Sequence, residues 1–257
     1  MKRTKIKKYL KLQTYCYIFL LSLLIISCSS KSRPEMMGVE EYFRIASDYF
    51  AKEDWIESQR YFDLIKLQYP ASAYADDAQY YLAEINFKRG EFILSAFNYT
   101  LLRKNYPSSP YNKEALFKTG LCYYEISPRF DRDQEYTMKA IQTFAEYQTF
   151  YAGDSLSFLA NKKIQELRDK LAEKEYETAV LYRKLSSPLA SSIYFDVVIN
   201  EYQDTKFYEE AIIGNIEVQI EMKKSIQVLY LVELYRRSFP NGKYLSFIEN
   251  IAKEYER

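Results

Sequence analysis

The stretches WIESQRYFDLIKLQYPASAY, residues 55–74, and FILSAFNYTLLRKNYPSSPY, residues 92–111, decide the fold of this chain. They are two versions of one pattern, displaced by 37 residues. The matched pairs are Trp55 and Phe92, Ser58 and Ser95, Phe62 and Tyr99, Tyr69-Pro70 and Tyr106-Pro107, and Tyr74 and Tyr111. A fixed period of this length is typical of stacked supersecondary units. The sequence therefore predicts a repeat protein.

The repeating unit resembles the tetratricopeptide repeat, a pair of antiparallel helices. In the first unit its marks are Tyr42, Ile45, Ala46 and Tyr49 on helix A, Ser58 and Phe62 on helix B, and Pro70 after it. Small residues let the two helices approach, and aromatic residues fill the wedge between neighbouring units. Proline ends helix B because it cannot donate the next backbone hydrogen bond.

Later units are less regular. The third has Ala140, Phe144 and Tyr147 on helix B after an insertion at 127–133, and the fourth has Ser191, Phe195 and Val198 after a long helix A at about 155–185. The fifth has Val232, Tyr235 and Phe239-Pro240, and a short helix at about 244–255 follows. We therefore expect an all-α fold: a right-handed superhelix of about five helical hairpins plus a C-terminal helix. We divide it into N-terminal repeats, 38–153, and C-terminal repeats, 154–257.

Composition supports this fold and argues against enzymatic chemistry. Six Gly and seven Pro in 257 residues leave few helix breakers. The absence of histidine removes the commonest general base and zinc ligand, and the chain has no Gly-rich phosphate loop. We expect no catalytic residues, no metal and no cofactor. Cys122 is expected to be a small buried core residue rather than a reactive thiol.

The first 27 residues have the order of an export signal. Six basic residues precede an apolar run from about Tyr15 to Ile26, and Ser27-Cys28 follows. Ile25 and Ser27 fit a lipobox, so we expect cleavage before Cys28, a covalent lipid on Cys28 and a flexible linker at 28–37. An uncleaved signal anchor is the alternative. Removing the six basic residues leaves 30 Lys and Arg against 35 Asp and Glu, a net charge of −5, which argues against a nucleic-acid partner.

Tyrosine is unusually abundant, with 27 in the chain. Tyr49, Tyr99 and Tyr123 occupy packing positions. The tyrosines at or near predicted helix starts are candidates to present a flat apolar face and a hydroxyl to an extended peptide. These candidate substrate contacts are Tyr42, Tyr74, Tyr80 and Tyr111.

The chain resembles the BamD family of outer-membrane β-barrel assembly lipoproteins. The resemblance rests on Tyr69-Pro70 with Ser72 and Tyr74, Tyr106-Pro107-Ser108 with Tyr111, the Ser127-Pro128-Arg129 insertion, the long helix around 170–176, and Tyr202-Gln203-Asp204-Thr205. It implies a non-enzymatic scaffold, lipid-anchored at the periplasmic face of the outer membrane. The N-terminal repeats would receive unfolded barrel precursors, and the C-terminal repeats would bind the periplasmic domains of the barrel subunit. Tyr176, Tyr182 and Arg183 are the implied partner contacts, and further assembly lipoproteins are possible partners.

Two departures from the family pattern are Gln203, where the family has proline, and the acidic mature chain. We expect Gln203 to loosen the end of its helix. Three other readings stay open: a generic periplasmic repeat adaptor in envelope maintenance or division, a surface lipoprotein that binds glycans, and a carboxylate-only hydrolase. No acid follows Cys28 until Glu35, which favours retention on the periplasmic side.

Overall fold

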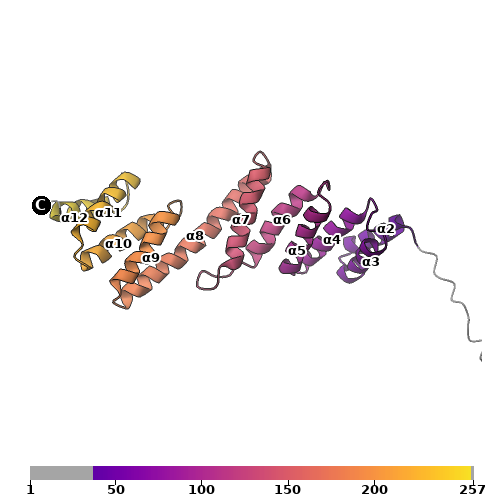
Figure 1. Ribbon diagram of the computed structural model, residues 1–257, viewed down its shortest axis with the longest axis horizontal. Coiled ribbons are helices and arrows are strands. Elements are labelled where there is room, and N and C mark those ends of the chain that lie inside the picture. The colour runs from indigo at the N-terminus through magenta and orange to yellow at the C-terminus, as the bar shows by residue number, and fades with distance from the viewer. Residues whose placement is uncertain (1–36, 256–257) are drawn as a thin grey trace, which may run out of the picture.

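A computed structural model describes residues 37–255, which form an elongated stack of helices (Figure 1). The first three hairpins are α2 (Val39–Ala51) with α3 (Trp55–Gln68), α4 (Ala75–Lys88) with α5 (Phe92–Asn105), and α6 (Asn112–Glu125) with α7 (Glu135–Phe150). The last two are α8 (Ser155–Lys184) with α9 (Pro188–Glu201) and α10 (Tyr208–Glu221) with α11 (Ser225–Ser238), followed by α12 (Leu245–Tyr255). Across the described residues the expected all-α fold of five hairpins and a terminal helix is confirmed.

The predicted signal peptide 1–27, the lipid site Cys28 and the linker up to residue 36 lie outside the described residues. Within residues 37–255, none of the helices combines the length and the apolar character needed to cross a bilayer.

A repeated hydrogen bond joins the two helices of a hairpin. The hydroxyl of Ser58 in α3 donates to the carbonyl of Ala46 in α2 at 2.9 Å. Ser95 makes the same bond to Ala83 at 2.9 Å, and Ser191 makes it to Ala179 at 2.8 Å. Each bond spans 12 residues and lies in the interior, so the serine satisfies its own buried hydroxyl while keeping the helices close.

Two glycines allow a phenylalanine ring of the neighbouring helix to pack directly on helix backbone. A Cβ atom on Gly120 of α6 would lie 2.7 Å from the ring of Phe144, and one on Gly214 of α10 would lie 2.5 Å from the ring of Phe195. Real Cβ atoms are not found so close to other atoms, so these rings pack directly on helix backbone. The predicted core positions Phe144 and Phe195 are fully or almost fully buried, as is Cys122.

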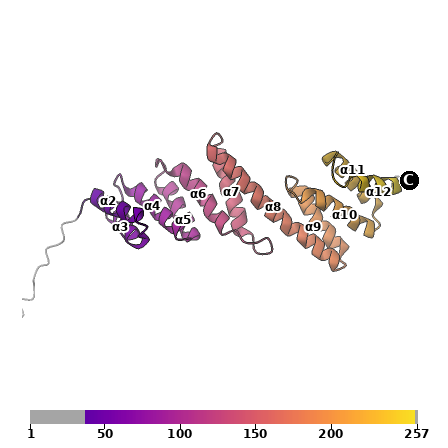
Figure 2. The ribbon, with the colours of Figure 1, turned by 180° about the vertical axis from the view of Figure 1, so that it is seen from behind.

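Helix α8 is the longest helix and links two halves of the stack. Its first part packs against α7, and its last part packs against α9 (Figure 2). The division expected at 153/154 falls at Asp154, whose side chain caps α8 by accepting a hydrogen bond from the Leu156 amide. The interior of the second half is rich in Ile and Val, whereas the first half is rich in Tyr and Phe.

Four of the five hairpins turn in the same way. The turn from helix A to helix B contains one residue with φ between +55° and +73°. These residues are Glu53, Gly90, Ser186 and Lys223. Only glycine adopts this left-handed conformation without steric cost. The α6–α7 connection differs because the predicted insertion at 127–133 lengthens it.

Candidate protein-binding surfaces

An aromatic ladder crosses the first two hairpins and ends on α6. The ring of Tyr74, at the start of α4, lies 4.9 Å from Phe43, measured between centroids. Phe43 contacts Tyr81, and Tyr81 contacts Tyr80. Tyr80 stacks on Tyr111 at 4.1 Å with an angle of 16° between the planes. Three of the four predicted substrate tyrosines therefore belong to one chain of ring contacts, which we call the aromatic ladder; it consists of Phe43, Tyr74, Tyr80, Tyr81 and Tyr111.

The tyrosines of the ladder differ in how much of each side chain is exposed to solvent. Tyr80 is only 8% exposed and packs in the core. Tyr74 and Tyr111 are half-buried and lie at the N-terminal ends of α4 and α6. The Tyr111 hydroxyl donates to the Asp77 carboxylate at 2.8 Å, which fixes the ring over Tyr80. Tyr80 is thus placed to support Tyr111 from below.

Tyr42, the fourth predicted substrate contact, lies outside the ladder. Its ring lies 6.2 Å from that of Tyr61 and 6.1 Å from that of Tyr69, both on the side of α3. The structure therefore brings together Tyr74, Tyr80 and Tyr111 but leaves Tyr42 in a separate aromatic group.

A buried polar cluster supports the ladder. Glu84 of α4 accepts hydrogen bonds from the Tyr99 hydroxyl and from the Lys118 ammonium. Lys118 also pairs with Glu114 at 3.1 Å and lies over the ring of Tyr80. Burial, together with the Glu84 carboxylate, raises the pKa of both Tyr80 and Tyr99, so both stay protonated.

Sequence reasoning did not identify this cluster. Its signal is visible in hindsight, because Glu84 interrupts the apolar run Leu82-Ala83-Glu84-Ile85. Such an acid can lie on the solvent face of a helix, but where it is buried, as here, it needs a cationic or hydroxyl partner.

A charged groove lies between α8, α10 and the start of α12. It has a volume of about 480 Å³ and its lining includes Tyr176, Arg183, Phe195, Glu210, Glu217 and Tyr244. We call it the C-terminal groove. Arg183 forms ion pairs with both Glu217 and Glu221 of α10. Glu210 accepts hydrogen bonds from Lys243 and Tyr244; although partial burial raises its pKa, these bonds hold that pKa below its usual value.

Two of the three predicted partner contacts line this groove. Tyr176 packs edge-on against Phe195 at 5.7 Å and lies 5.4 Å from Phe207, measured between ring centroids. Arg183 lies about two turns further along the same face of α8. Tyr182 does not line it. Its ring stacks on Tyr194 of α9 at 5.3 Å, in the same way that Tyr49 stacks on Tyr61 at 5.9 Å in the first hairpin.

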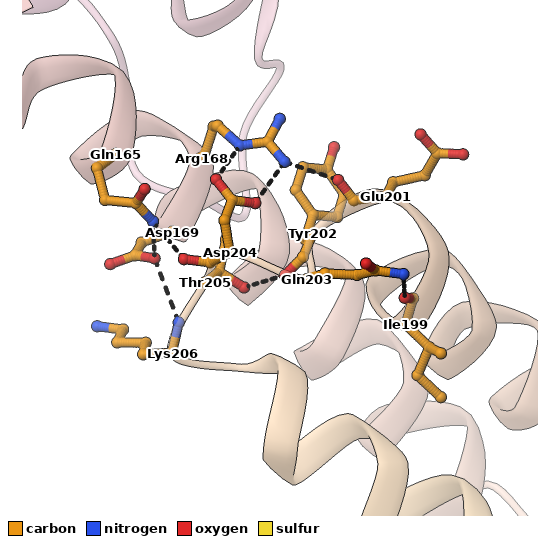
Figure 3. Close-up of polar contacts among 10 residues, drawn as sticks. All are labelled: Gln165, Arg168, Asp169, Ile199, Glu201, Tyr202, Gln203, Asp204, Thr205 and Lys206. Carbon is orange, nitrogen blue, oxygen red and sulfur yellow. Dashed lines mark hydrogen bonds and ion pairs between the residues drawn. The ribbon is translucent and has the colours of Figure 1, made fainter. Parts of the chain in front are cut away.

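The loop between α9 and α10 is fastened to the middle of α8 (Figure 3). Arg168 donates two hydrogen bonds of 2.6 Å to the Asp204 carboxylate and one of 2.7 Å to the Glu201 carbonyl. Gln165 donates to the Asp204 carbonyl at 2.8 Å. Such bidentate charge-assisted bonds fix both distance and orientation.

The expectation that Gln203 loosens the end of α9 is wrong. The Gln203 amide donates to the Ile199 carbonyl at 3.1 Å, one of the carbonyls left open at the helix end (Figure 3). The next two residues are held as well, Asp204 by Arg168 and Thr205 by a bond to the Tyr202 carbonyl. The Gln203 side chain and Arg168, which is distant in sequence, therefore fix the end of α9 where the family has proline.

Comparison with known proteins gives a consistent picture. The family described as "YfiO: Outer membrane lipoprotein" matches residues 35–228. Three relatives are each called "Outer membrane protein assembly factor BamD". The protein of Rickettsia prowazekii (strain Madrid E) is 25% identical over 55% of this chain and 57% of its own length. Those of Pasteurella multocida (strain Pm70) and Caulobacter vibrioides (strain ATCC 19089 / CIP 103742 / CB 15) are each 23% identical, over 79% and 85% of this chain and 82% and 78% of their own lengths.

Among solved structures, the chain is similar to the TPR domain of P58(IPK), with a TM-score of 0.44 and 14% identity over 79% of this chain and 52% of that one. The family match spans well over half of the 257 residues. It includes four of the five hairpins, the aromatic ladder, and the α8 and α10 walls of the C-terminal groove. The chain belongs to the YfiO family of outer membrane lipoproteins.

Proposed function

We propose that this protein is a non-enzymatic scaffold of the machinery that assembles β-barrel proteins into the outer membrane. One observation carries the proposal: a chain similar to BamD along most of its length presents two chemically different surfaces on the two halves of one helical stack. Stacked helical repeats offer long surfaces for protein ligands, and separate surfaces let one chain hold two partners at once.

The proposed location is the periplasmic face of the outer membrane, with a lipid on Cys28. The test is flotation of membranes that contain either the full-length protein or its Cys28→Ala variant, with mass spectrometry of the N-terminus. We expect the unaltered protein to carry an acylated Cys28. An unmodified N-terminus that begins at Met1 would instead show an uncleaved anchor.

The aromatic ladder is the proposed contact for unfolded barrel precursors. Tyr74 and Tyr111 would offer ring faces to an extended apolar segment, and Tyr80 would hold Tyr111 in place. Tyr42 would contribute from the neighbouring aromatic group. Flat rigid side chains suit extended peptides because they give contact area at low conformational cost.

The test for the ladder is binding of a fluorescent peptide copied from the last strand of an outer-membrane barrel. We expect Tyr111→Ala to weaken binding about tenfold, since one buried ring contact is worth about 1 to 1.5 kcal/mol. Tyr230→Ala removes an exposed tyrosine outside the ladder and serves as the matched control. Equal affinities for both variants would remove the ladder from the binding site.

The C-terminal groove is the proposed contact for the periplasmic domains of the barrel subunit, with Tyr176 and Arg183 as its central residues and Tyr182 at its flank. Arg183→Glu should abolish co-purification of the barrel subunit, because it places a third acid beside Glu217 and Glu221. Arg60→Glu is the matched control, since Arg60 also pairs with a nearby acid, Glu57, but lies on α3.

The experiment is an affinity pull-down of the full-length protein from gently solubilised membranes, with mass spectrometry of what co-purifies. Recovery of a barrel protein by the unaltered chain and by Arg60→Glu, but not by Arg183→Glu, supports the proposal. Recovery of division or peptidoglycan proteins without any barrel subunit would favour a generic envelope adaptor instead.

A further inference from the structure

Every helix B carries an exposed aliphatic side chain at the same place, two residues before the position of Ser58. These residues are Ile56, Ile93, Met138, Leu189 and Ile226, and they are between 56% and 79% exposed. All five lie near the turn that joins helix A to helix B, and the α6–α7, α8–α9 and α10–α11 turns lie along the lower edge of the stack in Figure 1. A single exposed aliphatic residue is ordinary on a protein surface, whereas several gathered together mark an interaction site.

The last two hairpins carry further exposed apolar residues around their turns. Around the α8–α9 turn, Leu181, Leu185, Leu189 and Ile193 are all more than half exposed, and Ile226 and Tyr230 are exposed beside the α10–α11 turn. We call these six residues the apolar tip. The two turns are held side by side, because Arg183 at the end of α8 donates to Glu221 at the end of α10 at 2.8 Å.

The charges around the tip differ from those of the first three turns. Those turns contain acids beside the aliphatic residue: Glu53, Asp54, Glu91, Asp131 and Asp133. Residues 184–190 and 222–227 contain no acid, but they contain the exposed residues Lys184, Lys223 and Lys224. None of these three lysines has an ion-pair partner among the described residues. The tip therefore combines exposed apolar side chains with three lysines that are close to them in sequence.

This combination fits a lipid surface better than a protein surface. Protein interfaces are depleted in lysine and enriched in arginine and aromatic residues. A membrane surface takes leucine and isoleucine into the acyl boundary, while lysine stems extend toward the phosphates. Each lysine near an anionic leaflet adds attraction, and the unpaired positive charge of the tip is complementary to such a leaflet.

We propose that the apolar tip and its three lysines form a second membrane-contact surface, which docks on a leaflet containing anionic phospholipid. The inference rests on the proposed lipid anchor for bringing the chain to the membrane. A lipid at the N-terminal end and a tip in the last two hairpins would hold the stack at two points, so the chain would lie along the membrane. One weak attachment reinforced by a second is how peripheral proteins gain stable binding.

The test uses the full-length lipidated protein in vesicles of phosphatidylethanolamine and phosphatidylglycerol. An environment-sensitive nitrobenzoxadiazole label is placed on Leu189→Cys in one sample and on Phe158→Cys in the other. Phe158 is also apolar and is more exposed than Leu189, at 81% against 61%, but it lies at the opposite end of α8. Cys122 does not compete for the label, because it is fully buried and burial raises the pKa of its thiol to about 12.

We expect doxyl-labelled lipids to quench the label at residue 189 and not at residue 158. Neutralising Lys223 and Lys224 to Gln should lower the ratio of docked to undocked tip about fivefold for each lysine. Vesicles of phosphatidylcholine alone should also lower the ratio of docked to undocked tip. Circular dichroism of each variant confirms that the helices remain folded.

The outcomes separate this inference from the proposed anchor. Protein that floats with the vesicles but shows equal quenching at 189 and 158, or none at either, overturns the membrane-contact tip and leaves the anchor standing; the tip would then face a protein partner. Protein that does not float at all overturns both. Quenching at 189 that is unchanged in the lysine variants and in phosphatidylcholine overturns the anionic preference.

Discussion

Glu84 in α4 and Glu217 in α10 occupy the same repeat position, six residues before the left-handed residue of their turn, yet they do different work. The Glu84 side chain is 10% exposed and joins Lys118 and Tyr99 inside the first half. The Glu217 side chain is 39% exposed and faces Arg183 across the C-terminal groove. The repeat thus fixes the position of a residue on its helix, and the neighbouring hairpin determines whether the side chain is buried or exposed.

The two halves are built from the same helical repeat, but they place their charged side chains differently. The first half buries a charged residue, Glu84, among the residues under the aromatic ladder. Among its described residues, the second half buries only uncharged polar side chains, such as Asn215 and Gln219, in an interior rich in Ile and Val, and places its charges in the groove and apolar residues at the tip. The following experiments test this contrast, from the largest expected effect to the smallest.

Replacing Glu84 by Ala should lower the free energy of unfolding by about 3 kcal/mol, because it leaves the buried Tyr99 hydroxyl without its partner and leaves Lys118 with only the more exposed Glu114. Glu217→Ala should lower it by only about 0.5 kcal/mol, because its pair is partly exposed and Arg183 keeps Glu221. Urea denaturation of the two variants measures both values. Similar losses for the two would contradict the distinction between the halves.

Gly120→Ala and Gly214→Ala should each destabilise the protein by about 2 kcal/mol, because each new methyl group meets a phenylalanine ring. The control is Gly153→Ala, where a Cβ atom would meet nothing within 4 Å. Shrinking the ring in the double variant Gly120→Ala with Phe144→Leu should recover part of the loss. If Gly120→Ala unfolds at the same urea concentration as Gly153→Ala, the direct packing of Phe144 on α6 is wrong.

Asp154 should make the join between the halves sensitive to acid. Hydrogen bonds from Lys113, from the Tyr147 hydroxyl and from the Leu156 amide lower its pKa from 3.8 to about 2. Because the pKa is lower in the folded state, its stabilisation is complete above the unfolded value and is lost as pH falls toward about 2. Asp154→Asn should therefore melt at a temperature that changes less between pH 5 and pH 2 than that of the unaltered protein. An unchanged slope would contradict this role.

The turns should show the smallest effects, with opposite signs. Gly90→Ala should cost about 1 kcal/mol, because alanine is strained at φ +73°. Glu53→Gly should stabilise by about 0.5 kcal/mol, since relief of the same strain exceeds the entropy cost of glycine. Thermal unfolding of both variants measures the difference. A loss of stability in Glu53→Gly would show that the Glu53 side chain has a use of its own.

Much of the fold followed from the sequence because the helix boundaries and packing positions repeat. The predicted long helix at 155–185 is observed as Ser155–Lys184, and the predicted core residues Phe62, Phe144, Phe195 and Tyr235 are buried. The turn conformations were less accessible, since Glu53, Ser186 and Lys223 are not residues that signal a left-handed turn.

The surfaces were harder to predict than the helices. Exposure depends on the neighbouring hairpin, so Tyr182 matched the family pattern but stacks on Tyr194 like a packing residue. Sequence alone did not indicate that Arg183 would already be paired with two acids, or that Leu181 and Leu185 would face solvent. The roles of all seven predicted contact residues, and of Cys28, stay predictions.

The central claim is that the two halves hold different partners. The most direct test places a photoreactive phenylalanine analogue at Tyr111 in one full-length variant and at Tyr176 in another, then cross-links in living cells and identifies the adducts by mass spectrometry. We predict adducts with β-barrel precursors from residue 111 and with the barrel subunit of the assembly machinery from residue 176. The same adducts from both positions, or adducts with neither class of protein, would contradict the account.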